Sequence, residues 1–135
     1  MKDIFHTLES LGSARIEGNR TTLAEFIETK LENNPNPDEK IIEILNVEKA
    51  INFIDQNAAE HPLNRAFIGE IHKIIVKDLN PRNEGDETPG IYRTKHVIIK
   101  NANHTPPDAS AVAEYMDELL QCLLSLVLML KKDVL

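Results

Sequence analysis

Hydrophobic residues recur at helical spacing along most of the chain, interrupted by short polar stretches. Between residues 3 and 16 an apolar side chain comes at almost every third or fourth position, as on one face of an amphipathic helix. Gly18 lies just past this pattern, where a helix often needs a residue with left-handed backbone. The pattern predicts a first helix that ends near Glu17.

Two further helices are predicted before the middle of the chain. Thr22 and Glu25 have the spacing of a capping box, in which each side chain bonds the other's backbone amide. A second helix should therefore run from about Leu23 to Glu32, and the turn-forming residues of segment 33–39 should end it. A wide apolar stripe then predicts a third helix from Glu39 to about Asp55.

The second half of the chain contains one stretch of different character. A fourth helix is expected from Pro62 to Leu79, followed by a polar loop over 80–90. Segment 89–100 is rich in β-branched and aromatic residues and predicts two short strands that turn near Thr94 and Lys95. A last helix should begin near Val112. The expected fold is mainly α, a helical bundle with one short β-hairpin, in a single domain over residues 1–135.

Composition narrows the possible partners. The 135 residues have a formal net charge of −7, with acidic and basic side chains interspersed, which argues against a nucleic-acid surface. The single cysteine, Cys122, cannot form an internal disulfide, and no Cys/His cluster predicts a metal site. The first residues lack an apolar leader, and the apolar run 119–130 is shorter than a membrane span, so we expect a cytoplasmic protein without a membrane partner.

Ser13 and Glu17 are the most suggestive candidate residues. They are four positions apart, so on a helix they share one face. A carboxylate at the C-terminal end of a helix opposes the helix dipole and is costly without a cation, and it could hold a guanidinium in a two-bond fork. Arg15 or Arg20 could supply that cation, or Glu17 could simply be solvated.

The predicted hairpin could accept an extended peptide along its edge, or it could be an ordinary covering hairpin.

Other constellations of catalytic type are missing from the sequence. The histidines are scattered without metal-ligand spacing, and no glycine-rich phosphate cradle is present. No nucleophile can be placed beside a base, so no residue is assigned to catalysis.

Three segments together resemble the Fic (filamentation induced by cyclic AMP) family. "SARIEG", residues 13–18, matches the inhibitory-helix motif of that family: Ser or Thr, three residues, Glu, then Gly or Asn. "TPGIYRTKHVIIKNANHTPPDASAVAEYMDELL", residues 88–120, resembles its flap region, and "FIGEIHKIIV", residues 67–76, resembles the helix before the flap. The similarity extends from about Ser13 to Leu120.

The resemblance implies a Fic-like helical core with a β-hairpin flap, and transfer of AMP from ATP, with Mg²⁺, to a hydroxyl of a target protein. In family members with an inhibitory helix, the motif's glutamate pairs with an arginine of the catalytic motif that otherwise grips the γ-phosphate. The region 1–20 would be the inhibitory helix region, with Glu17 in that role, Ser13 as the hydroxyl residue and Gly18 closing the helix. The residues of the target-docking flap would be Gly90, Ile91, Tyr92, Arg93, Thr94, Lys95, His96, Val97, Ile98 and Ile99.

One departure from the family is large. The catalytic signature His-x-Phe-x-Asp-Gly-Asn-Gly-Arg is not present, and with it the base, the Mg²⁺ ligand and the phosphate site. We therefore expect a truncated or degenerate Fic-like chain that binds no cofactor and is inactive by itself. Alternatively, the chain is an N-terminal fragment completed by another polypeptide, or Glu17 inhibits an intact Fic protein in trans. The partner would be a target protein or another Fic polypeptide, and the leucine-rich end, where the likeness fades, predicts self-association.

Overall fold

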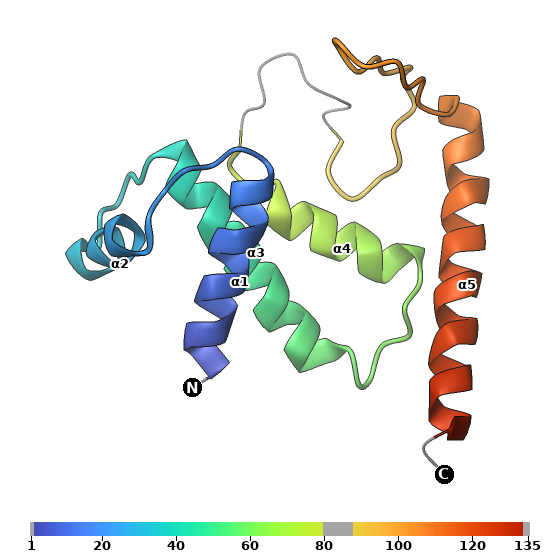
Figure 1. Cartoon of the computed structure of the whole chain (residues 1–135), viewed down its shortest axis with the longest axis horizontal. Helices are drawn as coiled ribbons and strands as arrows, with labels where there is room; N and C mark the ends of the chain where they lie inside the picture. Colours follow the sequence, from blue (N-terminus) through green and yellow to red (C-terminus); the bar gives the residue numbers. More distant parts are fainter. Residues whose placement is uncertain (1, 80–87, 134–135) are drawn as a thin grey trace.

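The computed structural model describes residues 2–79 and 88–133, apart from the side chains of 131–133. The described residues are mainly helical, as the sequence predicted. Figure 1 shows α1 lying across α3 with α2 to one side, and α4 leading from this group towards the long α5. The elements are α1 (Lys2–Ile16), α2 (Leu23–Glu32), α3 (Glu39–Asn57), α4 (Arg65–Ile75), the short 3₁₀ helix η1 (Ala109–Ala111) and α5 (Val112–Asp133).

Helix α1 ends in the way that its sequence predicts. Gly18 has φ +95°, and its amide donates to the carbonyl of Arg15 at 3.1 Å, while the next amide donates to the carbonyl of Ala14 at 3.0 Å. These two bonds form a Schellman motif, which satisfies the last carbonyls of a helix. The predicted end of the first helix is confirmed.

Helix α2 begins at the predicted capping box. The backbone amide of Glu25 donates to the Thr22 hydroxyl at 3.3 Å, and the Glu25 carboxylate accepts from the Thr22 amide at 2.7 Å. This amide lowers the pKa of Glu25 below its ordinary value. Phe26 then fills the core at 0% exposure, and Lys30 bonds both carboxylate oxygens of Glu48 on α3, at 2.9 and 2.6 Å.

Helix α3 is the central element, because α1, α2 and α4 all contact it. Its buried residues Ile41 and Ile44 form a core cluster with α1 and α2. Asn46, 2% exposed, donates from its amide nitrogen to the carbonyls of Ile75 and Lys77 at 3.1 and 2.6 Å. One side chain on α3 thus occupies carbonyls at the C-terminal end of α4, which have no partner within that helix.

Asn19 makes the corresponding link between α1 and α3. Its side chain is buried and donates to the carbonyl of Lys40 at 2.8 Å and to the carboxylate of Glu43 at 2.7 Å. Its oxygen accepts from the amide and the hydroxyl of Thr21 at 3.1 and 2.7 Å. The linker after α1 is therefore fixed onto the first turns of α3.

The fourth helix is shorter than the sequence predicted. It spans Arg65–Ile75, so the expected start at Pro62 and end at Leu79 are both wrong. Asn64 takes the N-cap position, where its side chain accepts from the amide of Phe67 at 2.9 Å. A side-chain cap satisfies a free helix amide, which proline at the first turn cannot do. Asp78 has left-handed backbone, with φ 60°, so the helix cannot continue to Leu79.

The predicted β-hairpin is wrong for the described residues. Residues 88–108 contain no strand, and segment 91–99 follows an irregular path above α4 (Figure 1). Its β-branched and aromatic residues indicated strand propensity, but that propensity needs a partner strand and a surface to pack on. The polar loop expected over 80–90 lies largely outside the described residues.

Helix α5 begins where predicted, after a cap that was not predicted. The Asp108 carboxylate accepts from the amide and hydroxyl of Ser110 at 2.9 and 2.7 Å and so starts η1. The same two bonds lower the pKa of Asp108. No helix among the described residues is long and apolar enough to cross a membrane.

Replacing Asn19 with Ala should lower the free energy of unfolding by about 1–3 kcal/mol, because buried partners on α3 and in the linker lose their bonds. Asn36→Ala is the matched control, because Asn36 is exposed in the α2–α3 turn, and it should change stability by less than about 0.5 kcal/mol. Urea denaturation followed by circular dichroism measures both values. Equal stability of the two variants would contradict the role given to Asn19.

Candidate functional site

The predicted inhibitory residues lie together at one exposed end of the helical group. Ser13 is in the last turn of α1, Glu17 directly follows the helix, and Gly18 makes the left-handed turn. All three are exposed. The Schellman bonds and the buried Asn19 hold the backbone next to Glu17, so the side chain of Glu17 extends from a fixed backbone position.

No described residue forms an ion pair or hydrogen bond with the carboxylate of Glu17. In the described part of the chain, neither Arg15 nor Arg20 pairs with it. The carboxylate is exposed, at the end of a helix whose dipole disfavours a negative charge.

The segment that was predicted to be the flap crosses α4 at two glycines. A Cβ added to Gly69 of α4 would lie 2.7 Å from the carbonyl oxygen of Gly90, so neither backbone has room for a side chain there. Gly90 also has φ +81°, and its amide donates to Nδ1 of His72 at 2.8 Å. This close crossing fixes the start of the segment against α4.

Further along, the segment is held mainly by bonds to its own backbone. The Arg93 guanidinium donates to the carbonyl of Lys95 at 2.9 Å and to the carbonyl of Pro107. These bonds close residues 93–107 into a loop in front of η1. No described hydrogen bond or ion pair joins Ser13, Glu17 or Gly18 to this loop. The described polar contacts do not connect the two predicted groups, and the docking role of residues 90–99 stays a prediction.

Sequence reasoning missed Arg65, which connects three segments. Its guanidinium bonds both carboxylate oxygens of Asp117 on α5, one of them at 2.6 Å, and the carbonyl of Ala113 at 3.3 Å. It also lies over the ring of Tyr92, 5.8 Å from its centre. The Arg65 bond lowers the pKa of Asp117, and the same bond raises the pKa of Arg65. The two residues are 52 positions apart, so no local pattern in the sequence could have paired them.

Tyr92 carries a polar atom without a partner. Its hydroxyl is buried and forms no hydrogen bond among the described residues. A buried hydroxyl of this kind is costly unless water or another group reaches it. Its ring provides the surface on which Arg65 lies, which accounts for the position of the side chain.

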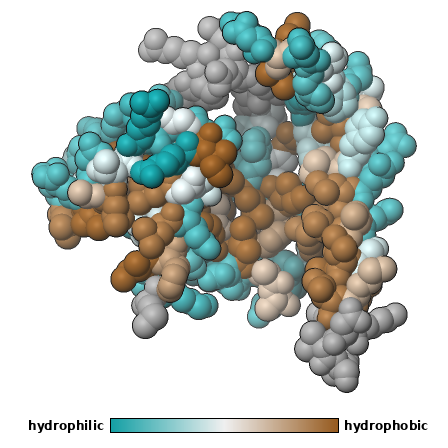
Figure 2. Space-filling view, viewed as in Figure 1, coloured by the Kyte–Doolittle hydropathy of each residue, from teal (hydrophilic) through white to brown (hydrophobic). Residues whose placement is uncertain are grey.

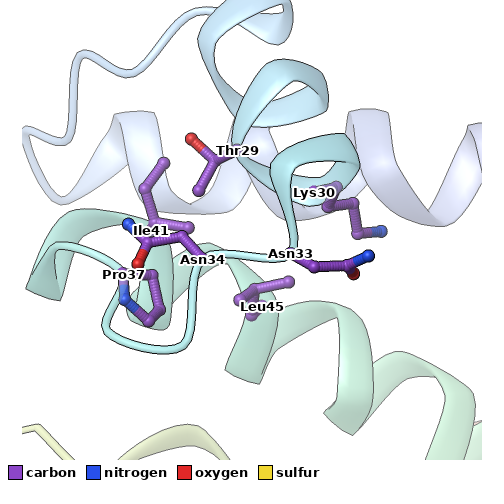
Figure 3. A pocket seen from close by; sticks show the side chains of 7 residues that line it. All are labelled: Thr29, Lys30, Asn33, Asn34, Pro37, Ile41 and Leu45. Carbon is purple, nitrogen blue, oxygen red and sulfur yellow. The ribbon is translucent and has the colours of Figure 1, made fainter.

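A pocket of about 440 Å³ opens between α2 and α3 (Figure 3). Its floor is formed by Ile41 and Leu45, and Lys30 and Asn33 extend together at one side. Lys30 is already bound to Glu48, so the pocket has an apolar floor and few polar groups left to orient a ligand. The complete set of lining residues is Thr29, Lys30, Asn33, Asn34, Pro37, Ile41 and Leu45.

The described residues include no group of three or more His, Cys, Asp or Glu side chains that could hold a metal ion. His6 is instead a buried structural residue: its two ring nitrogens lie 2.9 Å from the Asn52 oxygen and 3.1 Å from the Asp55 carboxylate.

Gly69→Ala should lower the free energy of unfolding by about 1–3 kcal/mol, because the new methyl group would collide with the backbone oxygen of Gly90. Gly12→Ala is the matched control. Gly12 lies on the exposed side of α1 with no atom within 4 Å of an added Cβ, so alanine should stabilise by about 0.5–1 kcal/mol. Thermal unfolding of both variants gives the comparison. Stabilisation by both substitutions would show that the segment does not cross α4 here.

The Asp117 carboxyl should titrate below the ordinary range of an aspartate, because Arg65 stabilises its charged form. A depressed folded-state pKa contributes stability above the unfolded pKa, and that contribution is lost as the pH falls through the folded pKa. A carboxyl-carbon NMR titration measures the value, with Arg65→Gln as the variant that restores an ordinary one. Identical titrations in the two proteins would contradict the Arg65 contact.

Compared with known proteins, this chain matches no family model and no curated protein. The likeness to the Fic family therefore rests on the two motifs and on the helix between them. Their residues occupy the end of α1, the body of α4 and the segment leading into α5.

Proposed function

We propose that this chain is a Fic-like interaction module that does not transfer AMP by itself and that binds an arginine of another Fic polypeptide through Glu17. The observation that carries the proposal is the exposed carboxylate of Glu17, which has no cation among the described residues. A trans-acting inhibitor needs such a group, because its glutamate must be available to a guanidinium of the partner.

The local structure supports this role in two ways. The Schellman turn at Gly18 and the buried Asn19 fix the end of α1, so little conformational entropy would be lost when the carboxylate is bound. Ser13 lies one turn earlier on the same helix and is exposed, so its hydroxyl can contribute to the same contact. The pair would offer a guanidinium a charge-assisted fork and a neighbouring acceptor.

The sequence supports the inactive part of the proposal. The sequence lacks the Fic signature. That signature would supply a histidine base, a metal-binding aspartate and a glycine-rich anion cradle. An adenylyl transfer needs the base to activate the target hydroxyl and the cradle to hold the phosphates. We therefore place the function of the chain in recognition.

The test uses a Fic-family adenylyltransferase whose own inhibitory glutamate is replaced by glycine, so that its catalytic arginine is available. Incorporation of labelled AMP from ATP into a target is measured while the purified chain is titrated in. We expect the chain to lower incorporation to a plateau. Glu17→Gln should weaken this inhibition about 10–100-fold, because it removes the charge of a two-bond ion pair.

Glu9→Gln is the matched control, since Glu9 is an exposed glutamate on α1 two turns before Glu17. It should inhibit as well as the parent. Inhibition that survives Glu17→Gln would end the proposal. A mixture that gains AMP transfer would instead support completion of an enzyme by the second polypeptide, and AMP transfer by the purified chain alone would contradict the inactive assignment.

A further inference from the structure

Six apolar residues of α5 follow a heptad repeat, and the last four of them are exposed. Their spacings alternate between four and three residues over about 28 Å of helix. This is the spacing of the core positions of a coiled coil, which face one partner helix along a continuous seam. The seam consists of Val112, Met116, Leu119, Leu123, Leu126 and Leu130.

Four polar residues of α5 lie on the side of the helix opposite the seam. At 100° per residue, Glu114, Glu118, Gln121 and Ser125 lie opposite the seam. Contacts with the rest of the molecule use a third side, where Asp117 and the carbonyl of Ala113 bind Arg65. These contacts leave Leu119, Leu123, Leu126 and Leu130 of the seam exposed, whereas Val112 and Met116 are half-buried.

Residues 121–130 of α5 are all exposed. Within residues 112–130, Leu120 is the one buried side chain. Eight large apolar side chains between residues 119 and 130 are 37–66% exposed. Figure 2 shows this apolar surface over α5 at the right of the molecule. A helix that is apolar on nearly every side is normally buried.

We propose that the seam of α5 pairs with α5 of a second copy of this chain, in antiparallel orientation. The four seam residues Leu119, Leu123, Leu126 and Leu130 are 37–66% exposed, so pairing would remove from water an apolar surface that the described chain leaves open. The pairing does not involve Glu17, so it is independent of the proposed function.

Charge and space select the antiparallel orientation. The first half of α5 carries Glu114, Asp117 and Glu118, whereas the sequence places lysines at 131 and 132 near its C-terminal end. Antiparallel helices bring the acidic half of one copy beside the lysine-bearing end of the other, and they align the helix dipoles favourably. Parallel helices would bring together the two acidic halves and two chain bodies of net negative charge.

The heptad spacing also fixes the register. Each heptad has two core positions, a and d. In an antiparallel pair an a residue of one helix faces a d residue of the other, so Leu123 lies opposite Leu126 of the second copy. One layer further out, Leu119 lies opposite Leu130 of the second copy. This register overlaps the whole exposed segment 119–130 and keeps the two chain bodies at opposite ends.

Sedimentation equilibrium of the purified chain tests the pairing. We expect the mass of two chains. The double substitution Leu123→Gln and Leu126→Gln removes four leucines from the seam of a pair and should raise the dissociation constant at least about 100-fold. The matched control is Leu124→Gln with Leu128→Gln, which makes the same chemical change on the same helix outside the seam and should leave the pair intact.

All four leucines are exposed in the single chain, so the variants should fold, and circular dichroism checks this. A mass of one chain for the parent, or of more than two chains, would overturn the proposal. Equal weakening by the two double variants would also overturn it, because it would show that general apolarity rather than the seam drives association.

Disulfide trapping tests the orientation in a Cys122→Ser background. Chains with Leu119→Cys are mixed with chains with Leu130→Cys and oxidised under mild conditions. The antiparallel register predicts a disulfide between the two different chains. A disulfide between two Leu119→Cys chains, which the antiparallel pair separates by about 16 Å along the axis, would refute the orientation.

Discussion

Two buried asparagine amides fix how α1, α3 and α4 are arranged. Asn19 connects the end of α1 to the first turns of α3, and Asn46 connects α3 to carbonyls at and just after the end of α4. A buried amide without hydrogen-bond partners costs more free energy than an apolar group in its place. Each asparagine therefore favours one position of the partner helix along its axis, the one at which its hydrogen bonds form. Apolar contacts around Ile44 supply much of the stabilisation, whereas the two amides supply the register.

The position of the candidate recognition residue follows from the first of these amides. Glu17 lies two residues before Asn19, and Gly18 between them takes the left-handed turn that ends the helix. The backbone is thus fixed on both sides of an exposed carboxylate. In the proposed function, binding of an external guanidinium would have to order only the side chain of Glu17, because its backbone is already fixed.

Helix α5 is attached to these helices by an exposed polar contact rather than by a buried amide. Its described link to α4 is the exposed side chain of Arg65, which pairs with Asp117 and bonds the carbonyl of Ala113. Exposed ion pairs contribute little stability, because water already solvates both charges well. The helix therefore keeps a large apolar surface that its own chain does not cover, and a second helix of the same sequence would cover it.

The sequence by itself determined the features whose causes are local. The capping box of Thr22 and the left-handed turn of Gly18 depend on neighbours within a few residues, so their patterns predicted the ends of two helices correctly. Features that depend on distant partners were decided only by the tertiary structure. The β-propensity of segment 91–99 produced no strand among the described residues, because the crossing at Gly69 and the loop bonds of Arg93 give that backbone other partners.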